Sequence, residues 1–271
     1  MYLGIDVGGT KTLVASLDDR GNITEKVRFP TDRDYPAFLE DLKHNIGKLK
    51  AGSFSHCAAG IPASVLDRSK GVGVRFGNLP WQDVSVRDDI ADICGCPVYM
   101  ENDAKLAGLS EALLLSGKYR SVMYVTVSTG IGLSLVVDGR IDTSFGDGGG
   151  RALLLEHVGK LEPWEDFASG RAIVKRYGHR AEDIDDPETW RQISRDLAQG
   201  LVQLIALAQP QVIVIGGGVG GHFDKYGDLL AEELKKYDLS PLPIPALKGA
   251  QHPEEAVLYG CYDLIKQAEA A

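Results

Sequence analysis

The chain has 271 residues, of which 44% are hydrophobic and 25% are charged, and its formal net charge is −9. This length allows one large domain or two modest ones, each with its own hydrophobic core. Because negative charge repels nucleic-acid backbones and anionic membrane surfaces, we expect neither nucleic acid nor a membrane among the partners.

The four cysteines are too few for a disulfide framework in a chain of this length, which favours a reducing compartment. No stretch approaches the ~18 apolar residues of a membrane span, and the first residues begin a strand without a signal peptide. We therefore expect a cytoplasmic protein. Cys94 and Cys96 are either a weak metal-binding pair or part of a tight turn between a helix and a strand.

The first half of the chain begins as a β-meander and continues with alternating strands and helices. The expected strands lie at 3–7, 13–17, 23–29, 56–61 and 97–100, and the expected helices at 35–49, 86–93 and 103–115. The pattern then restarts. The expected strands of the second half lie at 122–127, 131–137, 140–143 and 211–215, and the expected helices at 164–177, 190–209, 223–236 and 253–268.

The two halves share a pattern of strand, Gly/Thr turn, apolar strand, second turn and third strand, followed by helices. The Gly/Thr turns lie at 8–10 and 128–130, and the second turns at 19–21 and 138–139. Duplication of such a unit implies two α/β domains facing each other across a cleft. The alternative is a pair of unrelated β-meanders, which are common.

Residues 6–12 form the sharpest motif, because two glycines and two threonines directly follow a buried strand. Glycines allow a tight turn and close approach of the backbone to a ligand, and the N–H and hydroxyl groups can donate to phosphate oxygens. Lys11 adds a positive charge, and Asp6 can hold Mg²⁺ through water. The Walker pattern is absent, and a plain hairpin is the alternative.

Two further glycine-rich turns occur in the second half of the chain. Residues 128–132 repeat the first motif, so the two turns together can hold a triphosphate from both sides. Residues 213–221 contain five glycines where a strand meets a helix, which lets adenine and ribose lie against the backbone or serves ordinary packing. A Rossmann motif is not supported, because no βαβ unit follows with an acidic residue ~20 positions on.

Asn102 and Asp103 join an expected strand to an expected helix. Asp103 either caps that helix or takes the proton from a substrate hydroxyl as its oxygen attacks a γ-phosphate. Asn102 beside it can hydrogen-bond neighbouring hydroxyls. An ordinary carboxylate pKa suffices for this chemistry, since positioning supplies most of the catalysis.

In their order along the chain, these motifs resemble those of ROK-family sugar kinases. The matching segments are 6–11, 102–104, 128–132, 168–170 and 215–218. The resemblance covers essentially the whole chain and implies an α/β, actin-like (ribonuclease-H-like) duplicated two-domain fold with a cleft between the domains. We expect a smaller domain at 1–103 with the C-terminal helix 253–271, and a larger nucleotide-binding domain at 104–252.

The resemblance also implies ATP- and Mg²⁺-dependent phosphorylation of a hexose hydroxyl, usually by a dimer. It makes Asp103 the catalytic base and Asn102 and Glu165 sugar ligands, with Asp6 as the Mg²⁺ residue. The nucleotide-binding residues would be Asp6, Gly8, Gly9, Thr10, Lys11, Thr129, Gly130, Gly216, Gly217 and Gly218. The residues leave polyphosphate open as an alternative donor, and they do not name the sugar.

The chain departs from the family pattern before Glu165. The family carries a Glu-x-Gly-His motif whose Glu and His bind sugar hydroxyls, and the preferred register places Gly149 and Ala152 there. If that register holds, restoring Glu and His would restore glucokinase activity. Glu156 and His157, displaced by several residues, are an alternative pair of sugar ligands. The family's zinc-binding cysteine run is absent as well, so we expect no structural zinc.

Losing two hydrogen bonds to charged groups would cost about 3–6 kcal/mol, or ~10²–10⁴-fold in sugar affinity. Two functions follow. The first is an ATP-dependent kinase acting on a hexose or hexose-like hydroxyl, with its activity on glucose in doubt. The second is a nucleotide-binding, catalytically weak or inactive homologue that acts as a binding or regulatory protein.

Overall fold

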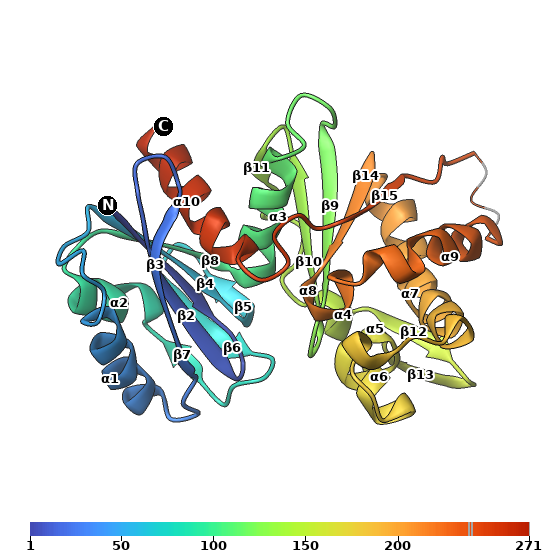
Figure 1. Ribbon diagram of the computed structural model, residues 1–271, viewed down its shortest axis with the longest axis horizontal. Helices are drawn as coiled ribbons and strands as arrows, with labels where there is room; N and C mark the ends of the chain where they lie inside the picture. Colours follow the sequence, from blue (N-terminus) through green and yellow to red (C-terminus); the bar gives the residue numbers. More distant parts are fainter. Residues whose placement is uncertain (238, 240, 271) are drawn as a thin grey trace. The chain divides into compact units, whose positions relative to one another are not determined.

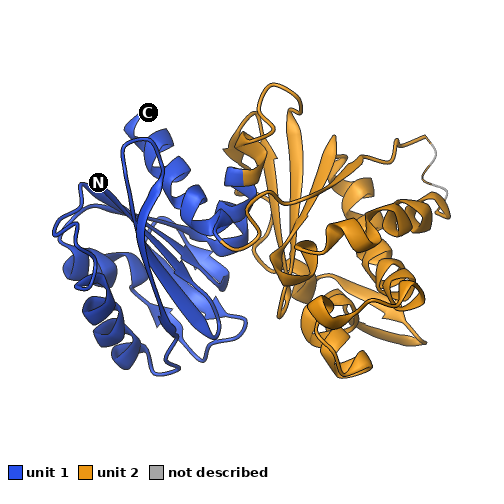
Figure 2. Ribbon diagram, in the orientation of Figure 1, with its two compact units in different colours: residues 1–110, 255–271 blue, residues 111–254 orange. Residues whose placement is uncertain are grey.

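The computed structural model describes residues 1–237, 239 and 241–270, and the chain forms two compact units (Figure 2). The first comprises residues 1–110 and 255–271, and the second comprises 111–254. One division falls within helix α3 (Asp103–Leu113), and the other lies just before helix α10 (Ala256–Glu269). The domain boundaries expected from the sequence, 103/104 and 252/253, stay predictions.

The first unit is built on a five-stranded mixed sheet in the order β3-β2-β1-β4-β8 (Figure 1). Its strands are β1 (Tyr2–Val7), β2 (Lys11–Leu17), β3 (Ile23–Pro30), β4 (His56–Ile61) and β8 (Val98–Asn102). β1 pairs antiparallel with β2 and parallel with β4, and β4 pairs parallel with β8. The central strand reads as a nearly continuous apolar run because both of its faces are covered.

Helices α1 (Tyr35–Ile46) and α2 (Val86–Cys94) cover one face of this sheet, where Leu3 and Ile5 pack in one core with Phe38 and Ile90. α10 covers the other face, since a side-chain carbon on Gly4 would lie 3.4 Å from Leu258. Alternate residues of one strand thus contribute to opposite faces.

Helix α1 begins where the sequence provides an N-cap. The Asp34 side chain accepts a hydrogen bond from the Ala37 N–H, and a proline lies in the first turn. The helix ends at Ile46, three residues before the expected position.

A small antiparallel sheet, absent from the expected elements, fills the gap between β4 and α2. Its strands are β5 (Ala63–Asp67), β6 (Val72–Phe76) and β7 (Gln82–Val84). Trp81 belongs to this insertion, is buried, and donates its ring N–H to the Arg33 carbonyl at 3.0 Å. These contacts give Trp81 a packing role in the core of the first unit.

The second unit repeats the plan of the first, with strand order β11-β10-β9-β14-β15. Its strands are β9 (Ser121–Val127), β10 (Ile131–Val137), β11 (Arg140–Ile141), β14 (Val212–Gly216) and β15 (Ala246–Gly249). β9 pairs antiparallel with β10 and parallel with β14, as β1 does with β2 and β4. The internal repeat expected from the sequence is therefore present in the sheet topology.

Between β11 and β14 the chain adds elements of its own. They are α4 (Gly149–Ala152), β12 (Leu154–His157), β13 (Lys160–Pro163), α5 (Trp164–Ala168), α6 (Gly170–Tyr177), η1 (Ala181–Asp183) and α7 (Pro187–Ala208). The hairpin β12–β13 was not expected. The helix expected at 164–177 is interrupted, because Ser169 is extended and its hydroxyl caps α6 at the Ala172 N–H.

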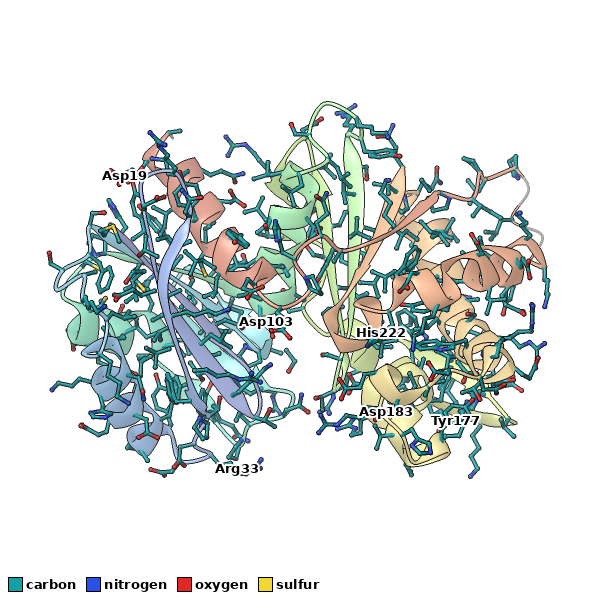
Figure 3. The ribbon with its side chains drawn as sticks, in the orientation of Figure 1. Asp19, Arg33, Asp103, Tyr177, Asp183 and His222 are labelled. Carbon is teal, nitrogen blue, oxygen red and sulfur yellow. The ribbon has the colours of Figure 1, made fainter. Side chains whose placement is uncertain are left out.

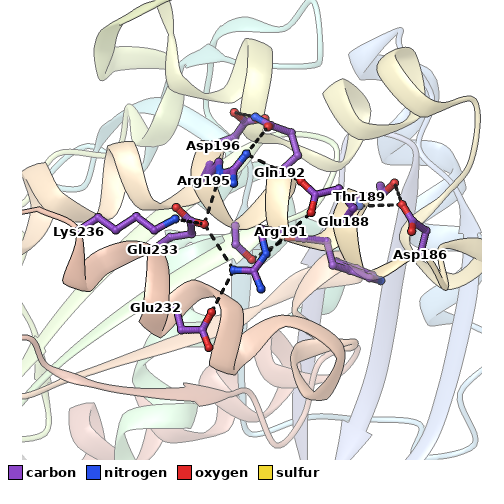
Figure 4. A network of polar contacts seen from close by, with 12 residues as sticks. Asp186, Glu188, Thr189, Arg191, Gln192, Arg195, Asp196, Glu232, Glu233 and Lys236 are labelled. Atoms are coloured by element: carbon purple, nitrogen blue, oxygen red, sulfur yellow. Dashed lines mark hydrogen bonds and ion pairs between the residues drawn. The ribbon is translucent and has the colours of Figure 1, made fainter.

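After β14 the glycine run forms one helical turn, α8 (Gly217–Gly220), before α9 (Phe223–Lys235). Long helices α7 and α9 are joined by ion pairs around the buried carboxylate of Glu233, which lies 2.6 Å from Lys236 and 3.3 Å from Arg195 (Figure 4). Trp164, Trp190 and Tyr226 are all fully buried in the core beneath them. Within the described residues, no helix is both long and apolar enough to cross a membrane.

Candidate active site

In the first unit, parallel pairing brings Asp6 and the start of α3 to the same edge of the sheet. Asp6 on β1 lies beside Gly60 on β4, and Gly60 lies beside Glu101 on β8. Asp103 follows two residues later and begins α3 (Figure 3). Polar side chains at the carboxyl ends of parallel strands are the usual place for a ligand site in α/β sheets.

The two carboxyl groups interact electrostatically. Burial, and after it the negative charge of Asp103, raises the pKa of Asp6 to about 7, while Lys11 acts in the opposite direction. When two carboxyl groups lie close together, the charge of one disfavours ionisation of the other. A divalent cation, or a proton, would relieve this repulsion.

Gly60 makes this approach possible. A side-chain carbon at Gly60 would lie 2.4 Å from Val257 and 3.4 Å from the Cα atom of Asp103. Gly60 could not be recognised from the sequence, because its role depends on segments that are distant along the chain. We infer that a side chain at Gly60 would displace Val257 of α10 from its place beside the start of α3.

The turn between β1 and β2 is as tight as the sequence predicts. The Gly8 N–H donates to the Lys11 carbonyl at 2.9 Å, and a side-chain carbon on Gly8 would lie 2.6 Å from the same oxygen. Thr31, which the sequence analysis missed, donates its hydroxyl to the Gly8 carbonyl at 2.8 Å and lies 2.8 Å from the Thr12 hydroxyl. Thr12 therefore supports the turn from inside, while the Thr10 and Lys11 side chains are exposed.

Asn102, rather than Asp103, caps α3. The Asn102 amide oxygen accepts a hydrogen bond from the Lys105 N–H at 3.2 Å, and its amide nitrogen donates to the Ala63 carbonyl at 3.0 Å. The capping role considered for Asp103 is therefore wrong, and its carboxyl group lies in the first turn, accepting from the Ala104 N–H. Both ends of the Asn102 amide have protein partners, which fix the residue beside Asp103.

Glu101 lies beneath this edge and is held by an arginine that sequence reasoning missed. The Arg68 Nε atom donates to Glu101 at 2.8 Å, and the same carboxylate accepts from the Asn102 N–H at 2.7 Å. Glu101 is buried, so Arg68 supplies the compensating charge. The pair fixes the backbone at the start of α3.

In the second unit, the carboxyl ends of the parallel strands β9 and β14 bring two glycine turns together. Gly216 is paired with Thr126, so the turn after β14 lies beside the turn after β9. Gly217 has φ +77°, and a side-chain carbon there would lie 2.7 Å from the Val127 carbonyl oxygen. Gly218 is exposed, with open space where a side chain would stand. Its backbone is thus accessible to a ligand.

The turn after β9 is held by the turn between α5 and α6. The Gly170 N–H donates to the Ser128 carbonyl at 2.7 Å, and the Ser128 N–H donates to the Gly130 carbonyl at 2.9 Å. Thr129 is exposed at the tip. Three motifs expected from the sequence therefore lie together in this unit, at 128–130, 168–170 and 216–218.

Glu165 lies against this same turn and is surrounded by two arginines. One carboxylate oxygen accepts from the Ile131 N–H at 3.3 Å, and the other lies 3.0 Å from the Arg151 Nε atom and 3.7 Å from Arg171. Glu165 is 8% exposed, whereas the two arginines are about half exposed. A side-chain carbon on Gly130 would lie 2.7 Å from Glu165. Neither arginine was expected from the sequence.

Arg151 comes from α4, between Gly149 and Ala152, the two positions that the preferred register assigns to the family's Glu and His. Gly149 has φ +53°, and a side-chain carbon there would lie 2.3 Å from the Ile131 carbonyl oxygen. A glutamate therefore cannot enter at Gly149 without displacing the backbone. Ala152 is exposed at the end of the same short helix. The register of this segment against the family pattern stays a prediction.

Glu156 and His157 lie on β12, and neighbouring residues of a strand point to opposite faces. Glu156 is exposed. His157 stacks on Phe167 with ring centroids 4.1 Å apart, and its Nδ1 atom lies 2.8 Å from Glu162. These contacts give His157 a packing role, and the sugar-binding role of both residues stays a prediction.

The segment before Glu165, where the family's zinc-binding run would lie, forms the hairpin β12–β13. All four cysteines belong to the first unit, and all are free. Among residues 1–237, 239 and 241–270, no group of three or more His, Cys, Asp or Glu could hold a metal ion. The expected Mg²⁺ role of Asp6 is compatible with this finding, because Mg²⁺ keeps several waters and takes few protein ligands.

The family model for the ROK family matches residues 2–268. A glucokinase of Streptomyces coelicolor is 24% identical over 318 aligned residues, which cover 99% of this chain and 98% of the relative. A fructokinase of Streptococcus mutans is 28% identical over 242 residues, covering 81% and 80%. The crystal structure of a ROK family glucokinase from Streptomyces griseus, in complex with glucose and AMPPNP, matches with a TM-score of 0.84 at 21% identity, covering 98% and 99%.

The structural match and the duplicated strand order confirm the actin-like, two-domain α/β fold expected from the sequence. With the family model spanning nearly every residue, the chain belongs to the ROK family.

Proposed function

We propose that this protein is an ATP-dependent kinase that phosphorylates a hexose or hexose-like hydroxyl. The observation that carries the proposal is the pair of carboxyl groups, Asp6 and Asp103, at one edge of the first unit's sheet. Relatives named glucokinase and fructokinase, and a structural neighbour that holds glucose and AMPPNP, support a sugar and a nucleotide as the ligands.

In this proposal Asp103 accepts the proton of the substrate hydroxyl as that oxygen attacks the γ-phosphorus atom. Its position at the start of α3 is fixed by Asn102, which caps the helix. The Gly8 N–H holds the turn closed on the Lys11 carbonyl, and the backbone amide of Gly9 and the exposed Thr10 and Lys11 bind phosphate oxygens. In the second unit, Thr129, Gly130 and the turn 216–218 bind the remainder of the nucleotide.

The carboxyl group of Asp6 fits Mg²⁺, a hard cation that prefers carboxylate and water oxygens. Bound with the nucleotide, Mg²⁺ neutralises charge on the phosphates. Burial, and after it the negative charge of Asp103, raises the pKa of Asp6, so a bound cation would favour its ionised form. Asp6 would hold the ion, through water, as a carboxylate.

A second candidate function is favoured by the ion pair between Arg151 and Glu165. If Glu165 is the sugar-binding glutamate, one of its oxygens is already bound to Arg151 and the other to the Ile131 N–H. Sugar binding would then be weak, and the protein would bind a nucleotide without rapid turnover. It would act as a binding or regulatory protein.

A coupled assay for ADP release, over a panel of hexoses and amino sugars, tests the first function. We expect turnover with at least one sugar, and a loss of about 10²–10⁴-fold in kcat on Asp103→Asn. ATP with Mg²⁺ should still raise the melting temperature of that variant. If ATP stabilises the wild-type protein but no sugar is turned over, the kinase proposal is wrong and the second function is supported. Size-exclusion chromatography with light scattering tests the expected homodimer.

A further inference from the structure

Three of the four cysteines gather at the amino end of β8, at the opposite end of that strand from Asn102. Cys94 ends α2, Cys96 precedes β8, and Cys57 lies on the neighbouring strand β4. The Sγ atoms of Cys94 and Cys96 are 3.4 Å apart. This cluster takes no part in the proposed kinase chemistry.

The turn between the two thiols is built by Gly95. It has φ +67°, and its N–H donates to the Ala91 carbonyl at 2.9 Å, which closes α2. Apart from α2 and the two neighbouring cysteines, no atom of the described residues lies within 4 Å of the place where a side chain would stand. The turn therefore brings both thiols into contact and has open space beside it.

The two thiols differ in their surroundings. Cys94 is partly exposed, whereas Cys96 and Cys57 are buried. A hydrogen bond from the Cys57 thiol lowers the pKa of Cys94, and hydrogen bonds from the backbone and the thiol of Cys96 act in the same direction. Burial raises the pKa of Cys96, as does its neighbour Cys94. The more accessible sulfur is thus also the better nucleophile.

We propose that Cys94 and Cys96 form an oxidisable dithiol, which a hydroperoxide converts into a disulfide across Gly95. The Cys94 thiolate attacks the hydrogen-bearing oxygen of the hydroperoxide, the O–O bond breaks, and the other oxygen leaves with the electron pair, as hydroxide from hydrogen peroxide or as alkoxide from an organic hydroperoxide. Cys94 becomes a sulfenic acid. The Cys96 sulfur then attacks the Cys94 sulfur. The S–O bond breaks, and the proton of Cys96 leaves with the oxygen as water. Two electrons pass from the two sulfurs to the peroxide.

Mass spectrometry can identify the bond, because trypsin separates the candidate partners. Cys94 and Cys96 share the peptide 88–105, and Cys57 lies in the peptide 51–68. After hydrogen peroxide treatment of the native protein and blocking with N-ethylmaleimide, we expect peptide 88–105 to lose two hydrogens and to carry no maleimide. Dithiothreitol should restore both thiols. Met100 shares this peptide, so gain of one oxygen is not scored.

Variants assign the roles. In Cys96→Ser, oxidation should stop at a sulfenic acid on Cys94, which dimedone traps. Cys94→Ser should be oxidised at least about tenfold more slowly than the wild-type protein. Cys57→Ala should still form the disulfide between Cys94 and Cys96. A cross-link between peptides 51–68 and 88–105 would overturn the pairing. So would irreversible oxidation of Cys94 without a disulfide, or four thiols that all survive peroxide. The peptide masses of the oxidised wild-type protein test the proposed disulfide even where a variant does not fold.

Discussion

The Nε atom of Arg151 lies 3.0 Å from a carboxylate oxygen of Glu165, the residue that we predict to bind the sugar. The guanidinium thus occupies hydrogen-bonding capacity that a sugar hydroxyl would otherwise use. Arg171, at 3.7 Å, makes a looser contact with the same oxygen. Arg151 is therefore the first side chain to change in a test of the altered sugar site.

We predict that Arg151→Ala raises kcat/KM for a neutral hexose by about tenfold, because one charge-assisted hydrogen bond to Glu165 becomes available to the sugar. Thermal stability should change little, since the pair is half exposed on the arginine side. The exposed Arg180→Ala serves as the control, with no expected effect on kinetics. A fall in kcat/KM on Arg151→Ala would instead mean that Arg151 itself contacts the substrate.

Gly149→Glu should destabilise the second unit rather than restore sugar binding. The position has φ +53°, and its new side-chain carbon would meet the Ile131 carbonyl oxygen at 2.3 Å. We expect a loss of about 1–3 kcal/mol in the free energy of unfolding, measured by urea denaturation. Gly146→Glu, in the same loop with open space around it, is the control and should cost much less. Equal stability of the two variants would contradict this account.

Asp6 should make stability depend on pH. Its pKa is about 7 in the folded protein and 3.8 in the unfolded chain, so between these values the folded state holds a proton that the unfolded state lacks. The free energy of unfolding should therefore fall as pH rises from 4 to 7. Three pKa units correspond to about 4 kcal/mol, and partial exposure of Asp6 reduces this to about 1–3 kcal/mol.

The measurement compares Asp6→Asn with the wild-type protein in urea at pH 5 and pH 8, without Mg²⁺. The variant does not titrate, so it should be the more stable protein at pH 8 and lose this advantage at pH 5. Asp19→Asn, at an exposed site, is the control and should follow the wild-type curve. A constant difference between Asp6→Asn and wild type at both pH values would refute the raised pKa.

Glu233 should be the most sensitive member of the ion network between α7 and α9. Its carboxylate is 4% exposed and pairs with Arg191, Arg195 and Lys236. Glu233→Ala leaves these cations without their buried partner and should cost about 2–4 kcal/mol. Glu232, 56% exposed and paired with Arg191, is the control, and its alanine variant should cost less than ~1 kcal/mol. Similar melting temperatures for the two variants would show that the network contributes little.

The strands that carry the repeat could be predicted because their signal is local. Tyr2–Val7 and Val212–Gly216 are apolar runs followed by glycines, so both the buried strand and the turn are visible in a short window. The hairpin β12–β13 gives no such signal. Its strands have four residues each, and several apolar side chains, such as Leu154 and Leu161, are exposed.

The candidate site was predictable only in part, for a related reason. The glycine turns lie where the sequence indicates them, and parallel pairing explains why Asp6 and Asp103 interact. The contact between Arg151 and Glu165 depends on α4, a single turn that starts at a glycine with positive φ and packs against β10. No pattern in the nearby sequence specifies that packing.

Helix α10 has a consequence for the order in which the molecule is made. Its Gly260 fits against the carbonyl of Leu106, and Val257 against Gly60, so the first unit needs residues translated about 150 positions later than its own α3. Residues 111–254 carry their entire core within one continuous stretch. On the ribosome, residues 111–254 can therefore become protease-resistant first, while the sheet of the first unit keeps one face uncovered until α10 has been translated.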